Sequence, residues 1–152
     1  MKILIVDDEF YARKALAKML NDWNPNNMII NEAENAREAI EKISIQRPDI
    51  VITDIRMPNM NGIELSKYLR RSYPEITVLI ISGYADFEYA RQAMSYGVTE
   101  YIVKPLDRDC LFKAMDRVKD KLEKEWSKES EKSMLKQYIN DARISDVLNK
   151  VI

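Results

Sequence analysis

Short apolar runs, separated by longer stretches with helical spacing, restrict this chain to few folds. The first run is Ile3–Val6, and the others are Met28–Ile30, Ile50–Thr53, Val78–Ile81 and Tyr101–Val103. Continuous apolar runs of this length are typical of strands buried on both faces of a parallel sheet. Because strand and helix patterns alternate, we predict an α/β domain with a doubly wound, five-stranded parallel sheet and helices on both faces.

Local signals mark the ends of several predicted helices. Asn35 can cap a helix that carries Glu38 in its first turn, an arrangement known as a capping box. Gly97 follows a helical pattern over Ala85–Tyr96 and is expected to adopt the left-handed conformation of a C-cap. The final helix is expected to begin near Asp107.

The C-terminal stretch differs in pattern from the rest. Residues 107–140 contain no proline or glycine, and the apolar stripe lapses between Trp126 and Met134 before it resumes. One interpretation is a solvated helix that covers an edge of the sheet. The other is a helical stalk that continues into another domain or pairs with a second copy. We expect residues 1–122 to form the α/β domain and residues 123–152 to form a helical linker or extension.

Composition excludes several kinds of chemistry. The chain of 152 residues has no histidine and a single cysteine, which excludes histidine-dependent catalysis and an intrachain disulfide. Lys and Arg number 24 against 25 Asp and Glu, so no charge bias favours nucleic acid or an anionic membrane as this chain's direct partner. The apolar runs are too short for a secretory signal or a membrane span, which favours a cytoplasmic protein.

Five polar side chains directly follow predicted strands. Asp7 and Asp8 end the first strand, and Asp54 ends the third. Ser82 ends the fourth strand, and Lys104 ends the fifth. The carboxyl ends of parallel strands meet at one edge of a sheet, where doubly wound folds bind their ligands. We therefore expect these five side chains to converge.

Each of these residues also has a purely structural interpretation. Asp7 and Asp8 could cap the helix that follows them, because aspartate is a favourable N-cap. Asp54 could form a turn, and Ser82 could supply a turn hydroxyl. Lys104 could be a counter-ion for the aspartates, a role compatible with a functional one. A joint interpretation explains all five positions together.

That joint interpretation is phosphoryl chemistry with a divalent cation. Crowded carboxylates repel one another unless a cation joins them, and Mg²⁺ prefers carboxylate and phosphate oxygens. A carboxylate beside such an ion can attack a phosphoryl group, as aspartates do in aspartyl-phosphate enzymes. Lys104 would neutralise charge on the transferred group, and the Ser82 hydroxyl would donate a hydrogen bond to it.

Four segments of the sequence resemble the receiver domains of two-component response regulators. They are Ile3–Glu9, Asp54–Gly62, Ile81–Tyr84 and Tyr101–Pro105, in the order and spacing of that family. Each segment alone is a weak signal, but together they extend the resemblance over residues 1 to about 120. The resemblance implies the flavodoxin-like receiver fold with strand order 2-1-3-4-5. It also implies a domain that catalyses only its own phosphorylation and dephosphorylation.

The resemblance further implies a phosphoacceptor and its metal ligands. Asp54 would accept the phosphoryl group from a sensor histidine kinase. Asp8 would bind Mg²⁺ directly and Asp7 largely through water. Asp54 itself and the backbone carbonyl of Arg56 would complete the protein ligands.

A conformational switch is implied as well. Lys104 would pair with the phosphate, and the Lys104–Pro105 peptide would be cis, which is uncommon even before proline. Ser82 and Tyr101 match the family's switch pair, in which phosphate draws the hydroxyl inward and the aromatic ring follows. The switch would repack the face formed by the helix over 85–96, the strand over 101–103 and the final helix, and so favour a homodimer.

The segment Ser82–Ala90 narrows the resemblance to receivers attached to AraC-type helix-turn-helix DNA-binding domains. Such a domain would lie beyond residue 152, and residues 123–152 would lead to it. Contact with DNA and regulation of transcription would depend on that domain. The alternative is a stand-alone receiver that acts by protein–protein contacts.

Two other classes of protein use related sheets. A haloacid-dehalogenase-like phosphatase would carry an Asp-x-Asp arrangement on its first strand, whereas Asp7 and Asp8 are adjacent. A flavin-binding module would need a phosphate-cradling loop after that strand. There, Asp7, Asp8 and Glu9 would repel phosphate without a metal. Both classes agree less well with the sequence than a receiver does.

Overall fold

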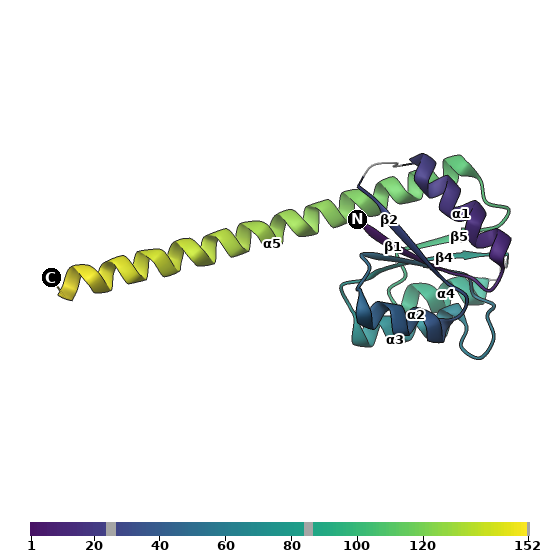
Figure 1. Cartoon of the computed structure of the whole chain (residues 1–152), viewed down its shortest axis with the longest axis horizontal. Coiled ribbons are helices and arrows are strands. Elements are labelled where there is room, and N and C mark those ends of the chain that lie inside the picture. Colours follow the sequence, from purple (N-terminus) through teal and green to yellow (C-terminus); the bar gives the residue numbers. More distant parts are fainter. Residues whose placement is uncertain (24–26, 84–86, 152) are drawn as a thin grey trace. The chain divides into compact units, whose positions relative to one another are not determined.

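A five-stranded, all-parallel sheet forms the centre of the α/β domain (Figure 1). The computed structural model describes residues 1–23, 27–83 and 87–151. The strand order is β2-β1-β3-β4-β5, which confirms the predicted fold and topology. The strands are β1 (Lys2–Val6), β2 (Ile29–Ala33), β3 (Ile50–Thr53), β4 (Thr77–Ser82) and β5 (Glu100–Val103).

Helices cover both faces of this sheet, as predicted. Helix α1 lies on one face, and α2, α3 and α4 lie on the other (Figure 1). The helices are α1 (Phe10–Trp23), α2 (Ala36–Ile45), α3 (Gly62–Ser72), α4 (Phe87–Ser95) and α5 (Arg108–Val151). The predicted start of the fourth helix at Ala85 lies outside the described residues.

The central strands owe their position to unbroken apolar sequence. All residues of β3 and β4 are buried, and Ile50, Ile52, Leu79 and Ile80 are 1% exposed or less. Burying one such side chain contributes about 1.5–3 kcal/mol relative to leaving it in water. The apolar runs within β3 and β4 are therefore buried inside the sheet, where both faces are covered.

The caps predicted at Asn35 and Gly97 are present, and α3 has a further cap at Asn61. The Asn35 side chain accepts a hydrogen bond from the Glu38 backbone N–H at 2.8 Å, and it caps α2. Asn61 caps α3 in the same way through the Glu64 N–H, also at 2.8 Å. Gly97 follows α4 with a φ of 76°, a left-handed conformation that glycine adopts without steric cost.

Helix α5 crosses the lapse in the apolar stripe without a break. Two compact units divide the chain, Met1–Ala114 and Met115–Ile152, and the division falls within this helix. The buried side chains of α5 end at Leu122, and residues 123–150 are all exposed. In the described parts of the chain, no helix combines the length and apolarity needed to cross a membrane.

Candidate functional site

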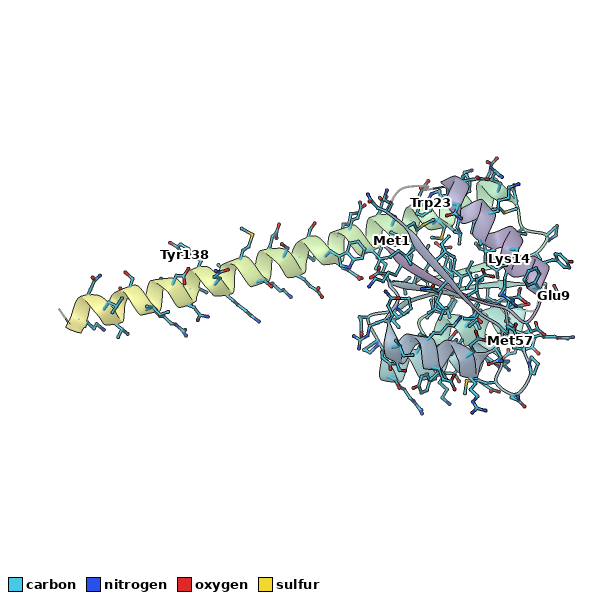
Figure 2. The ribbon with its side chains drawn as sticks, in the orientation of Figure 1. Met1, Glu9, Lys14, Trp23, Met57 and Tyr138 are labelled. Atoms are coloured by element: carbon cyan, nitrogen blue, oxygen red, sulfur yellow. The ribbon has the colours of Figure 1, made fainter. Side chains whose placement is uncertain are left out.

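Three carboxylates meet where β1 and β3 end. Backbone hydrogen bonds extend the pairing of the sheet to the residues that follow β1 and β3. The Asp7 N–H donates to the Ala33 carbonyl, and the Asp54 N–H donates to the Val6 carbonyl. One carboxylate oxygen from each of Asp7, Asp8 and Asp54 lies within 4.8 Å of the others. Glu9 and Met57, which follow these strands, mark the same end of the sheet in Figure 2. The structure thus brings together the three aspartates singled out in the sequence.

Lys104 lies between two of these carboxylates. Its Nζ is 3.5 Å from Asp7 Oδ2 and 3.4 Å from Asp54 Oδ2. The Lys104 backbone N–H donates to the Ser82 carbonyl at 2.8 Å, which ties the end of β5 to the end of β4. The Lys104–Pro105 peptide is cis, as predicted.

Burial and charge act against each other at this cluster. Burial raises the pKa of Asp7 above its usual 3.8, and the charges of Asp54 and Asp8 raise it further. A hydrogen bond from the Glu9 N–H to Asp7 Oδ1 at 2.9 Å and the Lys104 charge act the other way. Burial disfavours the charged form of Lys104, but Asp54 and Asp7 together raise its pKa above the usual 10.5. Lys104 is thus a cation at neutral pH, set between carboxylates that repel one another.

The loop after Asp54 depends on a close backbone approach. The Asp54 carboxylate accepts a hydrogen bond from the Ile55 N–H at 2.7 Å, which fixes its orientation. The Gly62 N–H donates to the Ile55 carbonyl at 2.8 Å and brings the start of α3 against Asp54. A Cβ at Gly62 would lie 2.1 Å from the Asp54 carbonyl oxygen, so no other residue fits there without a backbone shift.

Ser82 and Tyr101 lie on neighbouring strands, with Ser82 at the carboxyl end of β4 and Tyr101 two residues before the end of β5. Ser82 is fully buried at the end of β4, and Tyr101 is partly buried against the core. Ile80 pairs with Tyr101 in the sheet, so Ser82, two residues further along β4, faces the same side as Tyr101. Arg56 has an exposed side chain in the loop after Asp54, and its carbonyl as a metal ligand stays a prediction.

Sequence reasoning missed one charged residue near the site. Arg13 is 6% exposed, and its Nη1 donates to the Asp7 carbonyl at 2.8 Å. The helical pattern carried a signal, because Arg13 lies on the same stripe as the buried Leu16 and Leu20. A cation on an apolar stripe needs partners, and here they include the backbone of the acidic loop and the Glu32 carboxylate.

Two of the hollows in the domain differ in what they could hold. The hollow at the acidic site measures about 30 Å³ and is lined by Asp7, Asp54 and Lys104 among others. It fits an ion or a water and is far smaller than the pockets of about 300–1,000 Å³ that hold organic ligands. This argues against the flavin alternative.

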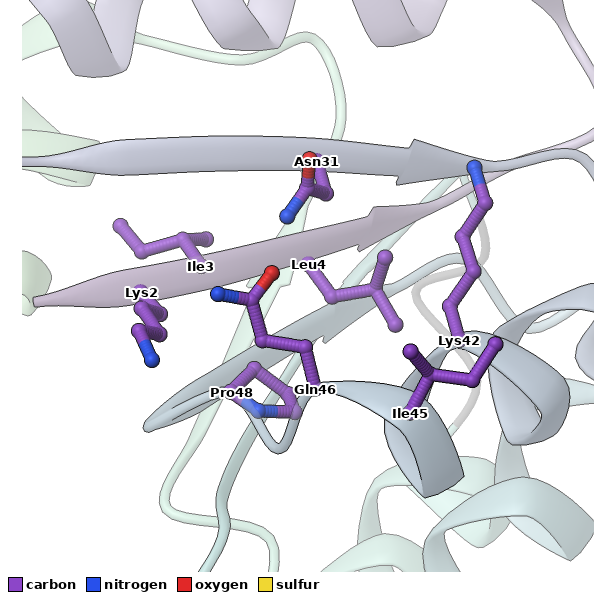
Figure 3. Close-up of a pocket in the computed structure, with 8 residues that line it drawn as sticks. All are labelled: Lys2, Ile3, Leu4, Asn31, Lys42, Ile45, Gln46 and Pro48. Carbon is purple, nitrogen blue, oxygen red and sulfur yellow. The ribbon is translucent and has the colours of Figure 1, made fainter.

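A larger hollow of about 210 Å³ is lined by residues from the start of β1, from β2 and from the end of α2 (Figure 3). Its residues are Lys2, Ile3, Leu4, Asn31, Lys42, Ile45, Gln46 and Pro48. The Lys42 amino group is engaged by the Glu32 carbonyl and by Glu38. No set of reactive groups converges there, so its greater size does not make it the functional site.

The acidic cluster fits a hard divalent cation. Its donors are carboxylate oxygens from three residues, close enough to share one ion. Mg²⁺ is usually held by one or two carboxylates with water and phosphate oxygens filling the other positions. Asp8, which is exposed, and the partly buried Asp54 leave such positions open to solvent.

The fold and the site define a class: a doubly wound parallel domain with an acidic cluster and a lysine at its carboxyl edge. The family profile of the response regulator receiver domain matches residues 3–116. The chain therefore belongs to the response regulator receiver domain family.

Curated relatives agree with this assignment. The transcriptional regulatory protein YesN of Bacillus subtilis is 37% identical over 117 residues, which are 77% of this chain and 32% of YesN. The transcriptional regulatory protein LnrK of the same species is 36% identical over 115 residues, which are 76% of this chain and 52% of LnrK. The chain thus spans about a third to a half of the length of these two relatives.

Solved structures share the fold. A receiver domain protein from Methanospirillum hungatei superposes with a TM-score of 0.74 at 27% identity, covering 82% of this chain and 97% of its own. The chemotaxis protein CheY4 of Vibrio cholerae gives a TM-score of 0.69 at 30% identity, covering 77% of this chain and 97% of its own. The similarity covers the α/β domain and nearly the whole of both proteins.

Proposed function

We propose that this receiver domain accepts a phosphoryl group on Asp54 and thereby switches an output. The observation that carries the proposal is the environment of Asp54. Its side chain is 15% exposed, 3.4 Å from Lys104, and beside two further carboxylates at the carboxyl edge of the sheet. An aspartate in such surroundings is both reachable by a phosphodonor and held for attack.

The proposed donor is a phosphohistidine of a sensor kinase. A carboxylate oxygen of Asp54 attacks phosphorus, the N–P bond breaks, and the electron pair returns to the imidazole of the kinase. Lys104 is placed to neutralise charge on the transferred group. Because the Ile55 N–H holds one Asp54 oxygen, the other oxygen points toward Lys104 and is the nucleophile. The chain itself catalyses no reaction other than gain and loss of this group.

The proposed cofactor is Mg²⁺, held by Asp7, Asp8, Asp54 and the Arg56 carbonyl. Bound there, the ion would supply charge stabilisation to the transferred phosphoryl oxygens. Asp7 is the most enclosed of the three carboxylates, and Asp8 is exposed. We propose that Asp8 contacts the ion directly and that Asp7 contacts it largely through water.

The proposed switch is the pair Ser82 and Tyr101. The Ser82 hydroxyl would donate to a phosphate oxygen on Asp54, and the Tyr101 ring would move toward the space it leaves. The Ser82 and Tyr101 side chains lie on the same face of neighbouring strands, which supports a coupled movement. Phosphate shifts the equilibrium only if it binds the rearranged state better. We expect the Ser82→Ala variant to accept the phosphoryl group. Phosphorylation should change the association state of this variant less than that of the wild type.

The proposed output is dimerisation and transcription regulation. The names of YesN and LnrK as transcriptional regulators support this direction, as does the part of their length outside the match. We propose an AraC-type DNA-binding domain as the output module, residues 1–122 as the receiver and residues 123–152 as the linker toward that module. We also propose a cytoplasmic location, where a sensor kinase could reach Asp54.

The test is the intact mass of the protein after incubation with acetyl phosphate, with and without Mg²⁺. We expect one added phosphoryl group that requires Mg²⁺ and is absent in Asp54→Asn. Size-exclusion chromatography of the same samples reports any change in association. An equally phosphorylated Asp54→Asn protein would refute the assignment of the phosphoacceptor.

A further inference from the structure

Arg13 is a buried cation that connects α1 to the loop carrying two of the three carboxylates. Its Nη1 donates to the Asp7 backbone carbonyl at 2.8 Å. On its other side, its Nε lies 3.2 Å from Glu32 Oε1, on β2. Its Nη2 is 3.9 Å from Glu34. A guanidinium is rigid and planar, so contacts on both sides hold it in one orientation.

The carbonyl that Arg13 holds belongs to the peptide joining Asp7 to Asp8. Asp7 and Asp54 have their own restraints, because backbone N–H groups and Lys104 fix both carboxylates. Asp8 is exposed, and its carboxylate makes no hydrogen bond or ion pair with the part of the chain that the structure describes. Its placement therefore depends on the backbone before it.

We infer that Arg13 is a positioning residue for the metal site, which orients the Asp7–Asp8 peptide so that the Asp8 carboxylate faces Asp7 and Asp54. The inference rests on the proposed function, since it presumes a divalent cation at these carboxylates. Arg13 is not one of the proposed metal ligands, and Glu32 holds its guanidinium in place. Groups that orient metal ligands typically change metal affinity by about 10–100-fold when they are removed.

Geometry, and not the charge of Arg13, carries this effect. The charges that shift the pKa of Asp7 are those of Lys104, Asp54 and Asp8. Arg13 meets the backbone oxygen of Asp7, and its own charge is balanced by Glu32 and Glu34. Phe10 adds a cover, with its ring centroid 5.6 Å from the Arg13 guanidinium carbon. Loss of Arg13 thus releases a backbone restraint and leaves the three carboxylates chemically intact.

The test is a calorimetric titration of Mg²⁺ into the full chain without a phosphodonor. We expect Arg13→Gln to raise the Kd about tenfold or more. Glu32→Gln, which frees the other side of the guanidinium, should shift the Kd in the same direction by a smaller factor. Lys14→Gln is the matched control, because Lys14 also pairs with Glu32 at 2.7 Å but, within the described residues, forms no hydrogen bond or ion pair with Asp7. It should leave the Kd unchanged.

A second readout separates positioning from direct catalysis. At saturating Mg²⁺, the rate of phosphorylation by acetyl phosphate should return to the wild-type value in Arg13→Gln. A rate that stays low at saturation would overturn the positioning role. Circular dichroism checks the fold, and if Arg13→Gln does not fold, Glu32→Gln carries the test.

The outcomes distinguish a failure of this inference from a failure of the proposed function on which it rests. A wild-type chain without Mg²⁺ binding contradicts the proposed function. Wild-type binding with an unchanged Kd in folded Arg13→Gln or Glu32→Gln overturns the inference alone.

Discussion

Asp7 is the more enclosed of the two carboxylates that contact Lys104. Its side chain is 9% exposed against 15% for Asp54. Burial raises its pKa, so the charged form that a metal requires is disfavoured in the metal-free protein. The negative charge of Asp7 therefore destabilises the metal-free folded protein, and a bound divalent cation would offset this effect.

Asp7→Asn should accordingly stabilise the metal-free protein. The amide keeps an acceptor for the Glu9 N–H and removes one negative charge from the cluster, while Lys104 keeps Asp54 as a partner. We expect unfolding in urea with EDTA to show a gain of about 1 kcal/mol. The same variant should gain less stability from added Mg²⁺ than the wild type. A less stable variant in EDTA would show that the ion pair with Lys104 outweighs the repulsion.

Gly62 is a second residue whose identity the site dictates. Gly62→Ala would place a Cβ 2.1 Å from the Asp54 carbonyl oxygen, and a backbone atom cannot yield as a side chain does. We expect a loss of about 1–3 kcal/mol, typical of overpacking, together with slower phosphorylation. Gly83→Ala is the control, because a Cβ there meets no atom within 4 Å. Equal stabilities for the two variants in urea would contradict this explanation.

At the scale of elements, the Asn35 cap of α2 is open to direct measurement. Asn35→Ala removes the acceptor of the Glu38 N–H, and we expect a loss of about 1 kcal/mol in urea unfolding. Asn35→Ser, which keeps a side-chain acceptor, should lose much less. No difference between these variants would mean that solvent replaces the cap.

Glu38 adds a dependence on pH to the same helix. A side-chain hydrogen bond from Lys42 and the Glu34 N–H hold the pKa of Glu38 below its usual 4.5. Because the folded-state pKa is lowered, this stabilisation is present above the unfolded value and is lost as pH falls through the folded one. The stability advantage of wild type over Glu38→Gln should therefore be present near neutral pH and decrease in acid. An advantage that persists in acid would contradict this origin.

The sequence predicted the elements best where one pattern decides the structure. Ile50–Thr53 forms β3 with the predicted bounds, because its apolar run is typical of a strand buried on both faces. The predicted second strand, Met28–Ile30, falls short of β2, which runs from Ile29 to Ala33. Strand β2 lies at an edge of the sheet, where polar residues are tolerated and the apolar pattern fails.

The site could be predicted as a set of residues but not as a geometry. Asp7, Asp54 and Lys104 follow from strand ends, since parallel strands end at one edge. The contact between Arg13 and the Asp7 carbonyl depends on how α1 packs, which no local pattern specifies. The approach of Gly62 to Asp54 likewise depends on the loop between β3 and α3.

At the scale of the whole molecule, the exposed part of α5 begins directly after Leu122, the last buried residue of that helix. Residues 123–150 have no buried side chain, and they include Met134, Leu135 and Tyr138 at 59–73% exposure. Isolated helices rarely hold their structure in water without packing. These residues therefore contribute little to the stability of the α/β domain.

A chain shortened to residues 1–122 should thus fold and accept phosphate as the full chain does. We expect an unchanged urea midpoint and an unchanged extent of Mg²⁺-dependent phosphorylation. Circular dichroism should show less helix per molecule. A shortened chain with a clearly lower midpoint would place residues 123–152 within the folding unit and contradict the proposed boundary.

The identity of the phosphorylated residue tests the account most directly. Borohydride reduces an aspartyl phosphate to homoserine, which marks the modified position permanently. After treatment with acetyl phosphate, Mg²⁺ and borohydride, peptide mass spectrometry should find homoserine at position 54 and unmodified aspartate at positions 7 and 8. Homoserine at another position, or none in a folded, Mg²⁺-loaded protein, would contradict the assignment of Asp54 as phosphoacceptor.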